Sequence, residues 1–282
     1  MHNIIKIFFF TYLSFFTFLH AVELDSSFSK NLISSKDMLT YIDKDSSKSL
    51  DFILKNQDSI FLHVNKSVFT YTTDTIWTKL TLNNTSKNEL NVYLMNDFVA
   101  LDKVDIYLVK DKKVYKKFFF GDTREVSNIE ILNRFANINL DVYPQKSIDI
   151  FIKYTSTTPI NTSLKVFSKS FYNDFILKDF SIWGFFVGIS LALVLYNLMI
   201  YFSLKEKAFL FYVLHALSNM YNTLTSSGHV HSLLSPILSN EFLNITYKIT
   251  PSLAIIFMSL FIISLFDLKR KILWLYYLNI GV

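Results

Sequence analysis

The sequence predicts an all-β, jelly-roll-like sandwich followed by an α-helical transmembrane bundle that is incomplete. Three observations lead to this prediction. Short segments between residues 22 and 177 alternate apolar with polar side chains, as strands of a half-buried sheet do. Residues 180–204 contain no charged side chain. Hydrophobic residues make up 51% of the 282 residues, which is high for a protein that is soluble throughout.

The N-terminus has the order of a secretory signal. Lys6 precedes the apolar residues 7–19, and Ala21 ends the segment. Thirteen apolar residues are too few to cross a bilayer, which needs about 20, so residues 1–21 are predicted to be a signal peptide. An uncleaved anchor remains an alternative, because Leu19 replaces the small residue usual two positions before Ala21. In both cases the following residues are exported.

Residues 22–177 are predicted to form an extracytoplasmic sensor domain. Residues 49–55 tolerate a helix, with Leu50, Ile53 and Leu54 on one side. Turn-forming residues recur about every ten positions after that, which favours an antiparallel two-sheet body. The clearest alternating segments are TIWTKLTL (75–82), LNVYLM (90–95), VDIYLV (104–109), NINLDV (137–142) and SIDIFIKY (147–154).

Three aromatic residues fall on the polar faces of these strands. They are Trp77, Tyr93 and Tyr107, with Lys79 and Asn91 beside them. An exposed ring next to hydrogen-bonding groups suits a sugar, whose C–H face is apolar and whose rim is polar. These five residues are therefore the predicted binding surface for a small molecule such as a carbohydrate. The alternative is that another part of the chain covers the rings.

The remainder, residues 178–282, is predicted to be a transmembrane region. Basic residues lie in the loops at 205–207 and 269–271, whereas the loop at 228–246 has none. The basic loops are expected in the cytoplasm, which places the sandwich in the periplasm and the chain in a bacterial inner membrane as a multi-pass protein. The predicted spans are residues 180–204, 208–227 and 247–266, with a partial fourth at 272–282, so the chain is expected to be a truncated form.

Two patterns inside these spans predict helix contacts. A polar stripe should face the bundle interior, where it acts either as a hydrogen-bond switch or as interhelical hydrogen bonding. A small-xxx-small pair lets another helix approach closely, and a homodimer is a candidate assembly. The stripe consists of Tyr212, His215, Asn219 and Asn222, and the pair consists of Gly184 and Gly188.

Nothing in the sequence predicts a catalytic residue, a metal ligand set or a cofactor site. The chain has no cysteine, and it has no glycine-rich phosphate loop or hydrolase motif. His229 and His231 lack a third ligand at recognisable spacing and are expected in a solvated loop. The net charge of +5 comes from scattered lysines, which does not predict a nucleic-acid surface.

Several stretches resemble one known family. They are IWTKLTLNNTS, VDIYL, NRFANINLDV, SLKVFSKSFY and GFFVGISLALVLYNLMIYFSLKEKAFLFYVLHALSNM. The chain is similar here to bacterial seven-transmembrane receptors with diverse intracellular signalling modules. The most specific part is the strand around Trp77 together with Gly184, Gly188, Tyr196, Asn197 and Tyr201. The resemblance implies a sensor domain similar to carbohydrate-binding modules, a seven-helix transducer, and an output such as a histidine kinase or diguanylate cyclase.

The expected function is therefore that of a membrane receptor and not of an enzyme. It would sense an extracytoplasmic small ligand and pass the signal through the helices to a cytoplasmic module. A membrane transporter with a periplasmic binding domain is the main alternative, since the polar stripe could form a midplane site. An adhesion or scaffold protein, whose sandwich binds a neighbouring protein, is a further alternative.

Overall fold

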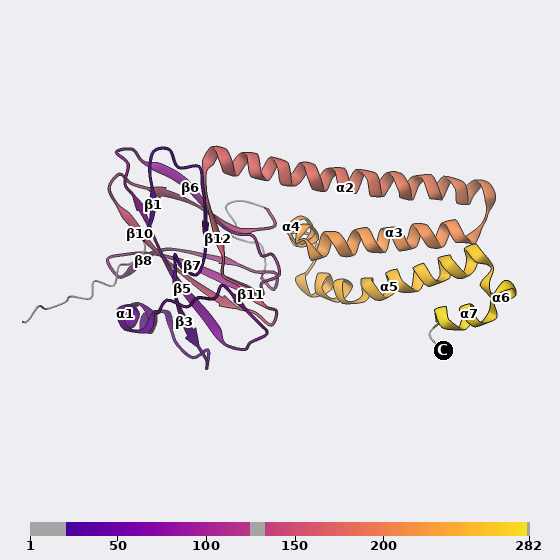
Figure 1. Cartoon of the computed structure of the whole chain (residues 1–282), viewed down its shortest axis with the longest axis horizontal. Coiled ribbons are helices and arrows are strands. Elements are labelled where there is room, and N and C mark those ends of the chain that lie inside the picture. The colour runs from indigo at the N-terminus through magenta and orange to yellow at the C-terminus, as the bar shows by residue number, and fades with distance from the viewer. Residues whose placement is uncertain (1–20, 125–132, 281–282) are drawn as a thin grey trace, which may run out of the picture.

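The computed structural model describes residues 21–124 and 133–280. It has two parts, a two-sheet sandwich and an arm of long helices that projects from it (Figure 1). Almost all of the predicted signal peptide lies outside the described residues. The predicted fold class, a jelly-roll-like sandwich followed by a helical region, is confirmed.

One sheet of the sandwich has six strands, and we call it sheet A. Its order is β1-β5-β10-β7-β8, and β3 shares the free edge of β5 with β1. All pairings are antiparallel except that of β1 with β5, which is parallel. The strands are β1 (Val22–Leu24), β3 (Leu39–Asp43), β5 (Thr75–Asn84), β7 (Lys103–Lys110), β8 (Lys113–Phe120) and β10 (Ser147–Thr155).

The second sheet, sheet B, has four antiparallel strands in the order β2-β12-β6-β9. A two-stranded ribbon of β4 (Val68–Phe69) and β11 (Ile160–Asn161) accompanies it. The strands of sheet B are β2 (Lys30–Ile33), β6 (Leu90–Asn96), β9 (Ala136–Val142) and β12 (Leu164–Ser168).

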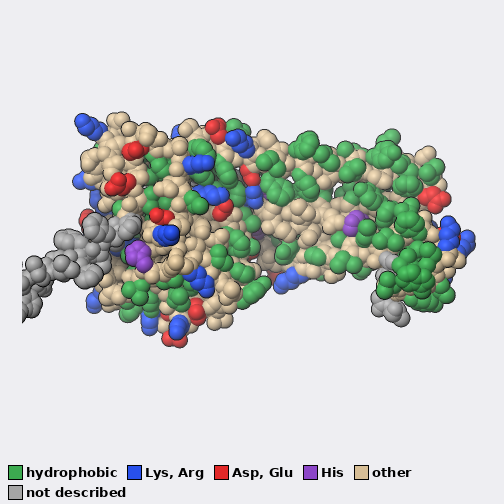
Figure 2. Space-filling view, in the orientation of Figure 1, with side chains coloured by type: hydrophobic (Ala, Val, Ile, Leu, Met, Phe, Trp, Pro, Cys, Tyr) green, Lys and Arg blue, Asp and Glu red, His purple; other side chains and the backbone are tan. Residues whose placement is uncertain are grey.

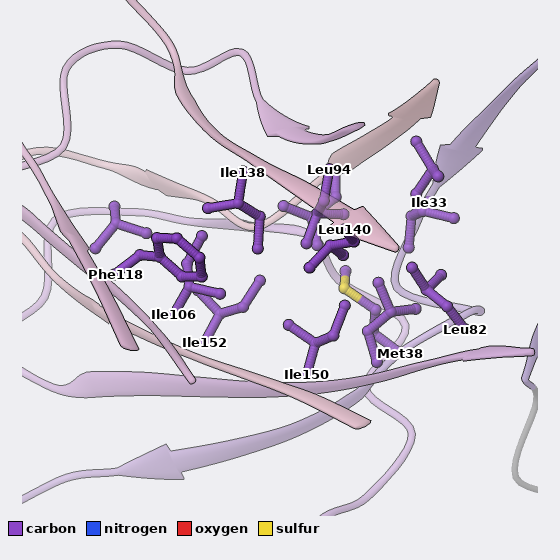
Figure 3. Packing of buried hydrophobic residues seen from close by; sticks show 14 of the residues in the cluster. Ile33, Met38, Leu82, Leu94, Ile106, Phe118, Ile138, Leu140, Ile150 and Ile152 are labelled. Carbon is purple, nitrogen blue, oxygen red and sulfur yellow. The ribbon is translucent and has the colours of Figure 1, made fainter. Parts of the chain in front are cut away.

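The core lies between the sheets and is built from the aliphatic faces that the alternation predicts. Ile106, Ile150 and Ile152 from sheet A point toward Ile138 and Leu140 from sheet B (Figure 3). Each of these side chains is at most 3% exposed. Removing so much apolar area from water, at about 25 cal/mol per Å², is the main force that holds the two sheets together.

A short helix, α1 (Leu50–Ile60), covers part of the outer face of sheet A. It begins where the Ser49 hydroxyl accepts a hydrogen bond from the Phe52 N–H, a typical N-cap. Ile53 and Leu54, on its apolar side, pack into a second cluster with residues of β5, β7 and β10. This outer face is therefore shielded from water where α1 lies on it.

Within the residues that the structure describes, the arm has three long helices that run side by side and three short ones. Among the helices of the described residues, α2 and α5 are long and apolar enough to cross a membrane. The more polar α3 packs between them. Lys205 and Asp267 end α2 and α5 in the left-handed conformation. The helices are α2 (Lys169–Leu204), α3 (Lys207–Ser226), α4 (His229–Leu234), α5 (Asn240–Phe266), α6 (Leu268–Lys271) and α7 (Leu273–Ile280).

The surface of the arm suits lipid. Hydrophobic side chains cover much of the face shown in Figure 2, while charged ones gather at the end farthest from the sandwich. Many large apolar side chains of α2 are exposed, among them Phe185 at 72% and Met199 at 71%. Water disfavours so large an apolar surface, whereas hydrocarbon does not.

Candidate functional site: the junction of sandwich and helices

The prediction that Trp77 and Tyr107 face water is wrong, because α1 covers them. Trp77 is 1% exposed and Tyr107 is 7% exposed, and their rings stack with centroids 6.0 Å apart. Lys79 is also buried, and its Nζ donates a hydrogen bond of 2.8 Å to Oε1 of Gln57 on α1. Burial, reinforced by Asp105, raises the pKa of Tyr107.

The other two residues of the predicted binding surface, Tyr93 and Asn91, lie on sheet B. Tyr93 is 9% exposed and stacks on Tyr172 of α2, with centroids 4.0 Å apart and planes 7° apart. The Asn91 side chain donates a hydrogen bond of 2.6 Å to Asp141 on β9. The five predicted residues are thus divided between two sheets and do not form one surface. Four of them, Trp77, Lys79, Tyr93 and Tyr107, are buried, and Asn91 is half-buried, so their role in ligand binding stays a prediction.

The first turns of α2 cover the outer face of sheet B. Strand β12 leads directly into α2, whose N-cap is Ser168. Phe167 stacks on both Phe171 and Phe175, with centroids 5.3 Å apart in each pair. The Tyr172 hydroxyl accepts a hydrogen bond from Asn133 and donates one to Asn137. The start of α2 is therefore packed firmly on the sandwich, eleven residues before the predicted span begins.

Arg134, which precedes β9, joins the sandwich to two helices at once. Its Nε and Nη2 donate hydrogen bonds of 2.9 and 2.5 Å to the Asp179 carboxylate of α2. Its Nη1 donates to the Ser227 carbonyl, at the end of α3, at 3.0 Å. The guanidinium also lies 5.5 Å from the ring centroid of Trp183. Charged bidentate pairs of this kind are strong and directional.

His229 lies next to the contacts of Arg134. The expectation that it lies in a solvated loop is therefore wrong. It begins α4 after Gly228, whose φ of 83° turns the chain out of α3. The His229 ring centroid is 4.7 Å from that of Trp183. Burial, and then the charge of Arg134, lower the pKa of His229. Over residues 21–124 and 133–280, no three His, Asp or Glu side chains are grouped to hold a metal ion.

A cavity of about 180 Å³ lies between the sandwich and the helices. We call it the junction cavity. Its sandwich wall contains Phe98, Leu101, Phe120 and Asp122, and its helical wall contains residues from α3, α4 and α5. Pockets between two structural units are common ligand sites. The helical lining residues are Thr225, Ser226, Gly228, His231, Ser232, Leu243, Asn244 and Tyr247.

A more open cleft lies on the sandwich alone. Tyr71, which is 78% exposed, lines it together with Asp102 and Lys103. Asp102 accepts hydrogen bonds from the N–H and the hydroxyl of Thr157. The remaining lining is rich in hydroxyl groups: Thr72, Thr73, Thr123, Thr155 and Ser156.

Part of the polar stripe of α3, His215 and Tyr212, lies against α5. His215 Nδ1 donates a hydrogen bond of 2.8 Å to the Ala254 carbonyl, and Asn219 lies 2.9 Å from His215 Nε2. The Tyr212 ring packs on Phe261. Asn222 has a buried Oδ1 that has no hydrogen-bond partner within the part of the chain described. The His215 contact is an interhelical hydrogen bond, whereas Asn219 is exposed and pairs with His215 on its own helix.

Gly184 and Gly188 lie on an open side of α2. A Cβ placed on either glycine meets nothing within 4 Å among the described residues. The predicted close approach of another helix is thus not made by α3 or α5. A contact of this pair with another helix, and a homodimer, stay predictions.

Comparisons with known proteins give two family matches. The model for the 7TMR-DISM extracellular 2 domain matches residues 35–168. The model for the 7TM diverse intracellular signalling region matches residues 179–282. No curated protein matches the sequence.

Two solved structures that resemble about half of this chain share little sequence identity with it. A β-glucosidase from Kluyveromyces marxianus in complex with glucose is 9% identical, with a TM-score of 0.29 over 48% of this chain and 17% of that one. A family 35 carbohydrate binding module from Clostridium thermocellum is 11% identical, with a TM-score of 0.24 over 50% and 99% of the two chains.

The extracellular match ends at Ser168, the last residue of β12, and the signalling-region match begins at Asp179 in α2, so together they take in most of the sandwich and of the arm. The first describes an extracellular domain and the second a membrane-spanning signalling region. The chain belongs to the membrane receptors with diverse intracellular signalling, 7TMR-DISM, and its sandwich is the extracellular domain.

Proposed function

We propose that the sandwich binds a small extracytoplasmic ligand and that the helices carry the resulting change toward a cytoplasmic output module. The observation that carries this proposal is the double contact of Arg134 with Asp179 on α2 and with Ser227 at the end of α3. We place the protein in a bacterial inner membrane with the sandwich in the periplasm.

The physical basis is the way in which the sandwich holds the helices. It contacts α2 through the aromatic stack of Phe167, Phe171 and Phe175, and it contacts α2 and α3 together through Arg134. A small rotation of the sandwich would therefore move α2 relative to α3. A ligand can drive such a shift only by as much as it prefers one arrangement over the other.

For the ligand surface, we propose the open cleft beside Tyr71, with a carbohydrate as ligand. The exposed Tyr71 ring can stack on the C–H face of a sugar. The threonine hydroxyls can donate to or accept from the hydroxyl groups at its rim, and the Lys103 ammonium can donate to them. This proposal replaces the predicted binding surface around Trp77, whose ring is buried.

The absence of cysteine permits a direct test. Cysteines introduced at the exposed positions Lys87 and Lys207 would carry spin labels on the sandwich and at the start of α3. With the full chain in lipid nanodiscs, the distance between the labels is measured with and without glucose, galactose, xylose and N-acetylglucosamine. At least one sugar should shift the distance distribution, and the added substitution Arg134→Gln should abolish the shift.

Tyr71→Ala tests the cleft. It should weaken binding of the active sugar at least tenfold, whereas Tyr115→Ala, at a tyrosine that is 56% exposed on β8, should not. If Tyr71→Ala leaves sugar binding intact, the cleft beside Tyr71 is not the ligand surface. In the protein that retains Arg134, a sugar that binds without changing the distance between the spin labels would contradict the proposed transmission from the sandwich to the helices.

A further inference from the structure

The junction cavity combines an apolar body with an uncompensated carboxylate. Phe98, Leu101, Phe120 and Leu243 supply apolar surface from both the sandwich and α5. Asp122 stands in the sandwich wall, and its Oδ1 is buried with no hydrogen-bond partner in the described ranges. Buried polar oxygens are normally paired, so one that is not is a candidate for a ligand contact.

The charges around the cavity leave it negative. Arg134 also lines it, but Asp179 already pairs with that guanidinium. Burial lowers the pKa of His231, which keeps its imidazole neutral near pH 7. None of the ion pairs found among the described residues includes Asp122, and the nearby carboxylate of Asp102 adds to the negative potential.

The size of the cavity limits the ligand to a small molecule. Its volume is about 180 Å³, whereas an apolar cavity of about 150 Å³ is known to admit benzene. One six-membered ring with a short substituent fits such a space. Aromatic side chains beside a carboxylate also favour a cation, because the ring faces attract positive charge.

We propose that the junction cavity binds a small organic amine, with its apolar body among Phe98, Phe120 and Leu243 and its ammonium group at Asp122. The bound amine would contact the sandwich and the ends of α3 and α5 together. The junction cavity and the cleft beside Tyr71 share no lining residue, so the amine proposal does not depend on the sugar proposal.

The test uses the full chain in lipid nanodiscs at pH 7.5, with empty nanodiscs as the blank for partitioning into lipid. Calorimetric titrations compare benzylamine, benzyl alcohol and benzoate, which share a ring and differ in the charge of the substituent. Benzylamine should bind at least tenfold more tightly than benzyl alcohol, and benzoate should not bind. Failure of benzylamine to bind beyond the blank would overturn the proposal.

Two variants test separately the charge of Asp122 and the volume of the junction cavity. Asp122→Asn should weaken benzylamine at least tenfold and change benzyl alcohol less than twofold. Ala100→Leu, in the cavity wall, should weaken both ligands. Asp141→Asn removes a carboxylate on β9 that does not line the cavity and should change neither. Unchanged benzylamine affinity in either Asp122→Asn or Ala100→Leu would overturn the site, and so would an equal loss of both ligands in Asp122→Asn.

Discussion

Arg134 and Asp179 are joined by two hydrogen bonds, of 2.9 and 2.5 Å, across the boundary between the sandwich and the helical arm. Both side chains are 14% exposed. Water screens such a pair far less than it screens an ion pair on the surface. The two hydrogen bonds also fix the orientation of the two side chains relative to each other, because the planar guanidinium matches the carboxylate in one orientation.

Loss of either partner should therefore destabilise the junction strongly. We expect Arg134→Gln or Asp179→Asn to lower the free energy of unfolding by about 2–4 kcal/mol, because each leaves the other group buried without its counter-charge. The double variant should cost less than the sum of the two. Chemical unfolding of the chain in nanodiscs, followed by near-UV circular dichroism, measures these differences.

The surface pair Lys112 and Asp58 provides the matched control. Its side chains are 64% and 74% exposed, with Nζ and Oδ2 3.1 Å apart. The substitutions Lys112→Gln and Asp58→Asn should each change the free energy of unfolding by less than about 0.5 kcal/mol. Equal effects at the buried and the exposed pair would show that the junction does not depend on Arg134.

The inner faces of the sandwich could be predicted from the sequence, but the coverings of its outer faces could not. Alternation assigns Ile150 and Ile152 to one face because the side-chain period of a strand is two. It says only that Trp77 lies on the opposite face. Whether that face meets water depends on where α1 packs, and this is a long-range contact that no local pattern encodes.

The junction was missed for a similar reason. Arg134 lies in the stretch NRFANINLDV, but its partner Asp179 is 45 residues later, and one arginine carries no signal of its own. From the sequence, His229 is expected in a loop because it lies between two predicted spans and has no third ligand group at recognisable spacing. Its burial follows from Trp183 on a different helix. The polar stripe on α3 could be predicted, because its members repeat every three or four residues along one helix.

Trp77 should contribute to stability. Its side chain is 1% exposed, so Trp77→Ala should cost about 3–5 kcal/mol through the cavity that it leaves. Trp77→Phe should cost less than about 1.5 kcal/mol, since it also removes a buried indole N–H that has no partner among the described residues. Urea unfolding followed by far-UV circular dichroism distinguishes the two. A stable Trp77→Ala protein would contradict the packing of α1 on sheet A.

Gly121 should tolerate no side chain. Its φ is +132°, and a Cβ there would lie 2.1 Å from the Asp102 carbonyl oxygen. Gly121→Ala should therefore cost more than about 3 kcal/mol, which exceeds the usual effect of a point substitution. Gly188→Ala is the comparison, because a Cβ on Gly188 meets nothing within 4 Å of the described residues. It should leave stability unchanged or raise it by up to about 1 kcal/mol.

Asp122 should make the stability of the sandwich depend on pH. Burial, and then the charge of Asp102, raise its pKa from 3.8 to about 6. Between pH 3.8 and 6 the folded state thus binds more protons than the unfolded state, so this residue lowers stability as the pH rises through that window. Asp122→Asn should be as stable as the wild type below pH 3.8 and more stable above pH 6, by about 1–2 kcal/mol after allowance for partial exposure. Urea unfolding at pH 3.5, 5 and 7.5 measures the difference, with Asp141→Asn as the carboxylate control. A difference that is constant across the three pH values, or that grows as the pH falls, would show that the Asp122 carboxylate is not destabilised by burial.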